Sequence, residues 1–167
     1  MIINPIQTTV FQEGENLLKF INRYIKKIPE KSILVVTSKI AAWAEKRTVV
    51  IKDEKTKEKL IRRESQLAIP TKYVWLTIKD GMVMPSAGID ESNANGKLIL
   101  LPKNSFWVAH TLWAALRKKH KLKQFGVLIT DSHTMPMRAG VIALALGYAG
   151  FKGVKTYIGL PDIFGRP

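Results

Sequence analysis

The apolar positions in the N-terminal third of the chain follow helical spacing in some segments and continuous runs in others. Residues 15–28 place apolar side chains three and four positions apart with lysines between them, and Pro29 follows, which predicts an amphipathic helix. Ser32–Thr37 is a short, almost wholly apolar run rich in β-branched residues, which predicts a strand covered on both faces. Residues 38–46 favour a second helix, and Arg47–Ile51 favours another short strand.

The middle of the chain predicts a charged helix, a hairpin and a polar loop. Residues 52–64 are mostly charged with few apolar anchors, so we expect a solvated helix rather than a core element. Tyr73–Lys79 alternates loosely and meets Asp80-Gly81, a turn signal, before a second apolar stretch, which predicts a β-hairpin. The polar residues 87–96 then lead to the apolar run Leu98–Leu101, and a polar loop between strands is a common place for ligand-binding groups.

The C-terminal third predicts one long helix and two apolar segments. Ser105 is a suitable N-cap for a helix that runs to about His120 and ends in the basic residues 117–123. Phe125–Thr130 predicts a second buried strand, with residues 131–138 leaving its carboxyl end, where ligands bind in open α/β sheets. Residues 140–150 are apolar and rich in Ala and Gly, which favours a tightly packed core element. The whole pattern predicts a mixed α/β (α+β) fold of short buried strands and flanking helices.

Composition narrows the class of protein. The chain has 167 residues, 46% of them hydrophobic, which predicts one domain spanning 1–167. It has no Cys, so disulfide scaffolds and thiolate metal sites are excluded. It has neither a run of about 18 apolar residues nor a signal-peptide pattern, so we expect a soluble, cytoplasmic protein with no membrane partner. Its formal net charge of +14 predicts attraction to nucleic acids, nucleotides or polycarboxylates.

Two carboxylates are the strongest candidates for chemistry. Asp90 lies in the polar loop beside hydroxyl and amide side chains, and Asp131 follows an apolar strand. Together they could hold Mg²⁺ or Mn²⁺ beside nucleotide phosphates, and the alternative is that they only cap turns. His133 is either a general base or metal ligand or a hydrogen-bonding loop residue. Arg138 either holds a phosphate or carboxylate with its guanidinium fork or forms a surface salt bridge.

Four ordered motifs resemble those of the coenzyme F420-0:gamma-glutamyl ligase family. They are Leu34–Ile40, Ala87–Asn93, Ile129–Ser132 and Asp162–Arg166. The sequence of residues 131–138 is similar to that of a bacterial branch of the family, which is linked to folate metabolism. The resemblance implies a gamma-glutamyl ligase-like fold. It also implies a GTP-dependent and metal-dependent reaction, in which L-glutamate is joined by an amide bond to an F420-0-like or folate-like acceptor through an acyl phosphate.

The resemblance also implies roles for individual residues. Asp90 and Asp131 would bind the metal, with Ser132 in the place of a metal-binding Thr, and Thr37, Ser38 and Asn93 would contact the nucleotide. Asp90, Asp131 and Arg138 are the expected catalytic residues, with Arg138 and nearby lysines holding anionic substrate. A family lysine shortly after Ser38 is replaced here by Trp43.

Two further expectations follow from the resemblance. Family members continue past the Phe164-Gly165-Arg166 motif, so we expect a C-terminally shortened member. The family also implies a homodimer. The competing hypothesis is a catalytically incomplete member, or a basic module that binds RNA or DNA through residues 52–63 and 117–123.

Overall fold

The computed structural model describes residues 1–51, 53–135 and 137–166. Its helices are α1 (Leu17–Tyr24), α2 (Ser38–Ala44), α3 (Glu54–Glu64), α4 (Ser105–His120) and a short 3-10 helix, η1 (Ser86–Gly88). Its strands are β1 (Ser32–Thr37), β2 (Thr48–Val50), β3 (Leu67–Pro70), β4 (Trp75–Lys79), β5 (Met82–Pro85), β6 (Lys97–Ile99), β7 (Phe125–Thr134) and β8 (Val141–Ala149). The predicted mixed α/β fold is therefore confirmed.

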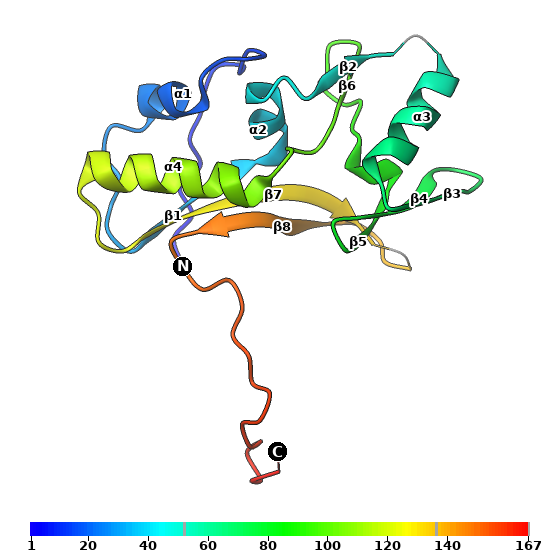
Figure 1. Cartoon of the computed structure of the whole chain (residues 1–167). Coiled ribbons are helices and arrows are strands. Elements are labelled where there is room, and N and C mark those ends of the chain that lie inside the picture. The colour runs from blue at the N-terminus through cyan, green and yellow to red at the C-terminus, as the bar shows by residue number, and fades with distance from the viewer. Residues whose placement is uncertain (52, 136, 167) are drawn as a thin grey trace.

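The largest sheet has helices on one face only. Its strand order is β1-β7-β8, and α1, α2 and α4 lie on the same side of it, as Figure 1 shows. The main core fills the space between these layers: α4 contributes Val108, Ala109, Leu112 and Leu116, and β7 contributes Val127 and Ile129, which are fully buried. Burial of such side chains stabilises the fold by about 1.5–3 kcal/mol each.

The opposite face of this sheet is open, which corrects two expectations. β1 was predicted to be covered on both faces, but Ile33 is 52% exposed and Val35 is 57% exposed because no helix covers that side. The segment 140–150 was predicted to be a core element, but it forms β8, an edge strand whose first residue, Val141, is 62% exposed. The apolar runs therefore predicted both strands correctly, but the prediction that these strands are buried was wrong.

β7 changes partners along its length. It pairs parallel to β1 from Phe125 to Thr130 and antiparallel to β8 from Val127 to Thr134, with a register shift at Ile129/Thr130. The expectation that the chain leaves the strand after Thr130 is wrong, because pairing with β8 extends the strand through residues 131–134. Asp131 therefore lies inside β7, just beyond the point where the parallel pairing ends.

A second region packs beside the first and contains the predicted hairpin. β4 and β5 pair antiparallel across the Asp80-Gly81 turn, β3 adds a strand that the sequence analysis missed, and β2 pairs with β6. α3 lies over these strands and buries Leu60 and Ile61, so it is anchored in the core more firmly than a solvated helix.

Local capping explains where the long helix begins. The N-cap of α4 is Asn104, not Ser105, because the Asn104 side chain accepts a hydrogen bond from the backbone N–H of Trp107 at 2.9 Å.

Among the described residues, no helix is both long and apolar enough to cross a membrane. After β8 the chain runs away from the layers as an extended segment, as Figure 1 shows.

Candidate functional site

The start of α2 brings the sequence-predicted Ser38 to Asp131. β1 ends at Thr37, whose register partner on β7 is Thr130, so the next residue on each segment lies at the same edge of the sheet. Ser38 is 2% exposed, and its hydroxyl donates a hydrogen bond to Oδ1 of Asp131. The hydroxyl proposed to contact a nucleotide is therefore used to hold a carboxylate.

The next residue of α2 holds the second carboxylate. Nζ of Lys39 lies 2.5 Å from Oδ2 of Asp90 and donates a hydrogen bond to Oγ of Ser92 at 2.7 Å. The backbone N–H of Ser92 donates to Oδ1 of Asp90 at 2.6 Å, and the backbone of Asp90 is paired with Ile99. Asp90 is thus fixed through both its side chain and its main chain.

The loop before Asp90 is backbone-strained and tightly packed. Ser86 and Ala87 both have positive φ angles, of 48° and 58°, in the left-handed region that L residues rarely adopt. Gly88, with φ 70°, has no room for a side chain, because a Cβ there would lie 2.7 Å from Cδ1 of Leu101. Strained backbone of this kind is concentrated at functional sites in proteins, which supports a functional interpretation of this loop.

The two carboxylates have pKa values shifted in opposite directions. Burial raises the pKa of Asp90, but the hydrogen bonds from Lys39 and Ser92 and the charge of Lys39 outweigh it, so the pKa is lowered overall. Burial also raises the pKa of Asp131, the nearby charge of Asp90 raises it further, and the hydrogen bond from Ser38 only partly compensates. Paired carboxylates with separated pKa values are typical of sites that bind cations or move protons.

Both carboxylates line one cleft of about 210 Å³. Ser132, His133 and Thr134 of β7 also line it, and its other walls are Gly88 of η1 and apolar residues of β5, β8 and the loop after η1. Among the described residues, no three His, Cys, Asp or Glu side chains cluster as a ready metal site. The available oxygen ligands are the two carboxylates and the hydroxyl of Ser132, which fits Mg²⁺ because that ion commonly binds one or two carboxylates and keeps several waters.

The remaining predicted site residues lie apart from this cleft. Thr37 is exposed at the end of β1, Asn93 is exposed in the polar loop with φ 56°, and Arg138 is exposed in the connection between β7 and β8. None of the three lines the cleft. Trp43, in the place of the family's lysine, packs its side chain against the core.

Sequence reasoning missed Lys39. The only sequence feature that could have indicated its role is its position directly after Ser38. Consecutive side chains in the first turn of a helix point in different directions, so Ser38 and Lys39 can reach two separate carboxylates.

Comparison with known proteins identifies the family. A family model described as F420-0:Gamma-glutamyl ligase matches residues 5–167, nearly the whole chain. This chain belongs to that family. The resemblance seen in the four sequence motifs is confirmed, and the protein is an enzyme of a ligase family.

Several relatives carry the name coenzyme F420:L-glutamate ligase. The protein of Archaeoglobus fulgidus is 27% identical over 94% of this chain and 70% of its own length. That of Methanopyrus kandleri is 34% identical over 69% of this chain and 46% of its own length. That of Methanosarcina mazei is 27% identical over 94% of this chain and 68% of its own length. The matched region therefore spans about half to seven tenths of these relatives.

Proposed function

We propose that the protein is a GTP-dependent and divalent-metal-dependent gamma-glutamyl ligase. In this reaction an oxygen of the acceptor carboxylate attacks the γ-phosphorus of GTP, which gives an acyl phosphate and releases GDP. The amino group of L-glutamate then attacks the acyl carbon, phosphate leaves, the amine loses a proton and an amide bond forms. The names of the relatives favour an F420-like acceptor, and a folate-like acceptor is the other candidate.

The observation that carries this proposal is the meeting of Asp90 and Asp131 in one cleft. The two residues come from segments about forty positions apart, and each is held by a different residue of α2. Mg²⁺ or Mn²⁺ bound by these carboxylates and Ser132 would offset charge on the nucleotide phosphates. Asp131 lies just beyond the end of the parallel β1–β7 pairing, and Asp90 reaches the same cleft from the loop after η1, an arrangement that can serve this function.

Roles for the exposed residues belong to the same proposal. Thr37 and Asn93 lie on segments that lead directly to Ser38 and Asp90, so a nucleotide seated against the carboxylates can extend toward both. The guanidinium of Arg138 is exposed near the end of β7 and can bind the carboxylate of an anionic substrate by a bidentate contact. Lys39 keeps Asp90 ionised and in place, which makes it a positioning residue.

We also propose that two copies pair through the open face of the β1-β7-β8 sheet. Ile33, Val35 and Val141 lie on this face by register and are each more than half exposed. Exposed apolar side chains gathered on one sheet face often mark an interface with another protein chain. Light scattering is expected to give the mass of a dimer, and Val35→Lys is expected to shift it to a monomer. A monomer of the unaltered chain at micromolar concentration would contradict this pairing.

The experiment that tests the ligase site is calorimetric titration of GTP with and without Mn²⁺. We expect metal-dependent binding by the unaltered chain and its loss in both Asp90→Asn and Asp131→Asn. The matched control is Asp80→Asn, which makes the same chemical change in the exposed β4–β5 turn. Metal-dependent GTP binding that survives in both site variants, or no GTP binding by the folded chain, would overturn the proposal.

A further inference from the structure

Two basic segments meet at the end of the molecule where α4 finishes. The side chain of Asn22 on α1 accepts a hydrogen bond from Nζ of Lys119 on α4 at 2.5 Å, which places the two helices side by side. Residues 15–31 and 117–124 together hold ten Lys and Arg residues and two acidic ones. We call this the α1–α4 basic surface; its cations are Lys19, Arg23, Lys26, Lys27, Lys31, Arg117, Lys118, Lys119, Lys121 and Lys123.

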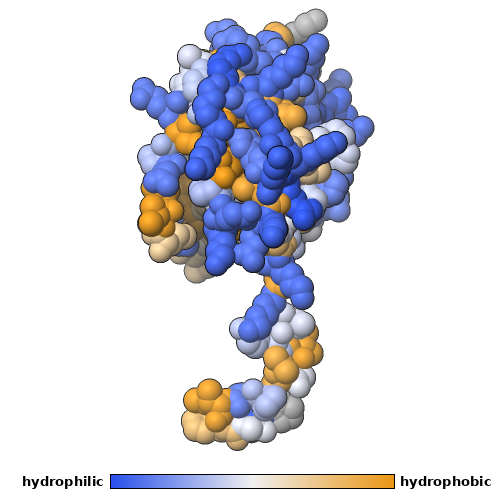
Figure 2. All heavy atoms as spheres, turned by 90° about the vertical axis from the view of Figure 1, so that its left-hand side faces the viewer, coloured by the Kyte–Doolittle hydropathy of each residue, from blue (hydrophilic) through white to orange (hydrophobic). Residues whose placement is uncertain are grey.

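The cations of this surface are largely uncompensated. All ten are exposed, and within the described residues only Arg23 forms an ion pair, with Glu15 at 2.8 Å. The other acidic residue, Glu30, accepts hydrogen bonds from the backbone N–H groups of Lys123 and Gln124. Figure 2 faces this end of the molecule and shows long hydrophilic side chains over most of it, with small apolar areas between them.

The basic residues of α3 differ in both place and pairing. α3 lies at the opposite end of the molecule from the end of α4, as Figure 1 shows, so the two segments of the competing nucleic-acid hypothesis, 52–63 and 117–123, lie apart. Position 52 itself lies outside the described residues. Lys57, Arg62 and Arg63 of α3 are each in ion pairs with acidic side chains. Lys55 and Lys59 of α3 are exposed and form no ion pair within the described residues, but nine of the ten cations of the α1–α4 basic surface are unpaired, so more free positive charge lies there than on α3.

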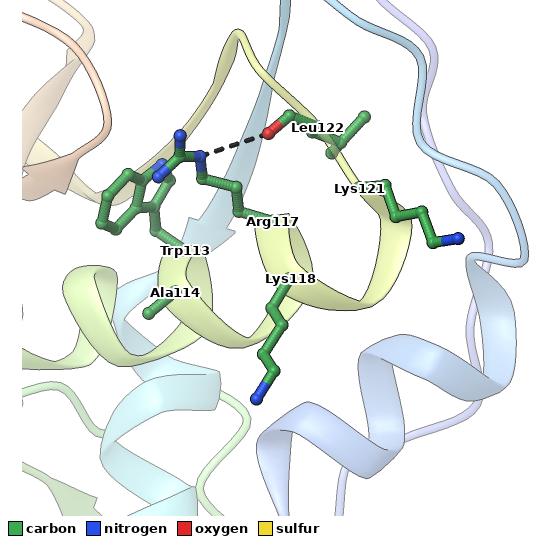
Figure 3. Close-up of a pocket in the computed structure, with 6 residues that line it drawn as sticks. All are labelled: Trp113, Ala114, Arg117, Lys118, Lys121 and Leu122. Atoms are coloured by element: carbon green, nitrogen blue, oxygen red, sulfur yellow. Dashed lines mark hydrogen bonds between the residues drawn. The ribbon is translucent and has the colours of Figure 1, made fainter.

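A shallow hollow of about 290 Å³ lies within this surface, shown in Figure 3. Arg117 is folded over the ring of Trp113, 5.2 Å from its centroid, and its Nε donates to the backbone oxygen of Leu122 at 3.2 Å. Lys118 and Lys121 extend away from the helix and away from the Arg117–Trp113 pair. Arg117 is committed to ending the helix, whereas the two lysines remain available to an anion.

We propose that the α1–α4 basic surface binds the phosphodiester backbone of nucleic acid. Residues 11–32 and 108–134 expose no large hydrophobic side chain. A protein interface would need an apolar centre, and a membrane-binding helix would need an apolar face to insert. Exposed cations on two adjacent helices and on the segments that follow them instead suit a row of phosphates. Such a row is bound by charge and without sequence preference.

This surface is separate from the carboxylate cleft. The basic surface lies beside Phe125 at the start of β7, and Asp131 lies six residues further along the strand, about 20 Å away at the rise of an extended strand. At physiological ionic strength the Debye length is about 8 Å, so charges at the two places interact weakly. Binding of nucleic acid is therefore expected to leave metal-dependent GTP binding unchanged.

The test is fluorescence anisotropy with labelled duplex DNA and with single-stranded RNA at several KCl concentrations. The test variant is Lys27→Gln/Lys118→Gln/Lys121→Gln. The matched control is Lys55→Gln/Lys59→Gln/Lys72→Gln, which removes the same charge from exposed positions of α3 and the β3–β4 loop. Both variants are first shown by circular dichroism to unfold at the temperature of the unaltered chain.

For duplex DNA, the test variant is expected to lower the slope of log affinity against log salt by about 2.7, since each phosphate contact contributes about 0.9. The affinity ratio between the unaltered chain and this variant then changes by about 40-fold between about 50 and about 200 mM KCl. The control is expected to keep the original slope.

Equal loss in the two variants, no binding to either nucleic acid, or tighter binding to poly-L-glutamate or to vesicles of phosphatidylserine and phosphatidylcholine would overturn the proposal. A preference between DNA and RNA would support it and identify which phosphodiester polymer is bound.

Discussion

Replacing Ser38 by alanine isolates the contact that holds Asp131 in place. Ser38 is 2% exposed and its hydroxyl donates to a carboxylate oxygen, so Ser38→Ala removes the donor where water has little access. A hydrogen bond to a charged group contributes about 1.5–3 kcal/mol, and because Asp131 is only half-buried we expect a loss of about 1.5 kcal/mol. For a chain of this length that corresponds to a fall in Tm of about 3–6 °C.

The same substitution has a predictable pH dependence. The hydrogen bond from Ser38 favours the ionised form of Asp131, so its loss raises the pKa of Asp131 further above the ordinary value. The variant then folds with a carboxyl group that resists ionisation more strongly, and it loses more stability than the unaltered chain as pH rises through that pKa. The stability difference is expected to be largest at neutral pH and to close as pH falls below the pKa of Asp131.

Thermal unfolding of both proteins from neutral to acidic pH measures this difference. Ser132→Ala serves as the control, because Ser132 is exposed on the same strand next to Asp131 and its loss should leave the metal-free Tm almost unchanged. A Tm difference between Ser38→Ala and the unaltered chain that is absent at neutral pH, or that is the same at every pH, would refute the assigned role of Ser38.

Three further predictions concern the site and its supports. Gly147→Ala places a Cβ 2.4 Å from the backbone carbon of Ser105, so α4 must move and urea unfolding should show a loss of about 1–3 kcal/mol. Burial raises the pKa of Glu64, but the hydrogen bonds and charges of Arg47 and Lys79 outweigh it and lower the pKa overall. Glu64→Gln is therefore expected to lower Tm at neutral pH, with the difference closing below about pH 4. At a hundred times its Kd, Mn²⁺ is expected to stabilise the unaltered chain by about 2.7 kcal/mol, which is seen as a rise in Tm, and Asp131→Asn is expected to abolish that rise.

Local sequence patterns predicted most elements of the fold, because each is determined by residues close together in the chain. β1 has the bounds that its β-branched run indicated, and α4 spans the predicted residues, with only its cap one position earlier. Burial was harder to predict. An apolar run such as β8 fits a strand covered on both faces and an edge strand equally well, and only the positions of the helices decide between them.

The site was predicted in part for the same reason. Asp90 and Asp131 stood out as carboxylates next to apolar strands, and the register of β1 with β7 brings the segment after Thr37 to Asp131. The ion pair of Lys39 joins α2 to a loop some fifty positions later, and no local pattern encodes that contact. Long-range contacts of this kind depend on the packed structure, so sequence reasoning found the carboxylates and missed the residue that restrains one of them.

The geometry of the cleft depends on how closely α2 approaches the sheet. Ser38 and Lys39 are consecutive, yet they restrain different carboxylates, so one displacement of α2 would disturb both contacts together. α2 presents Ala41 and Ala42 to the core, and both are essentially fully buried. Because small side chains let a helix pack closely against its neighbours, the positions of Asp90 and Asp131 are set partly by residues that touch neither carboxylate. The chemistry of the cleft and the packing of the core are therefore linked through a helix of seven residues.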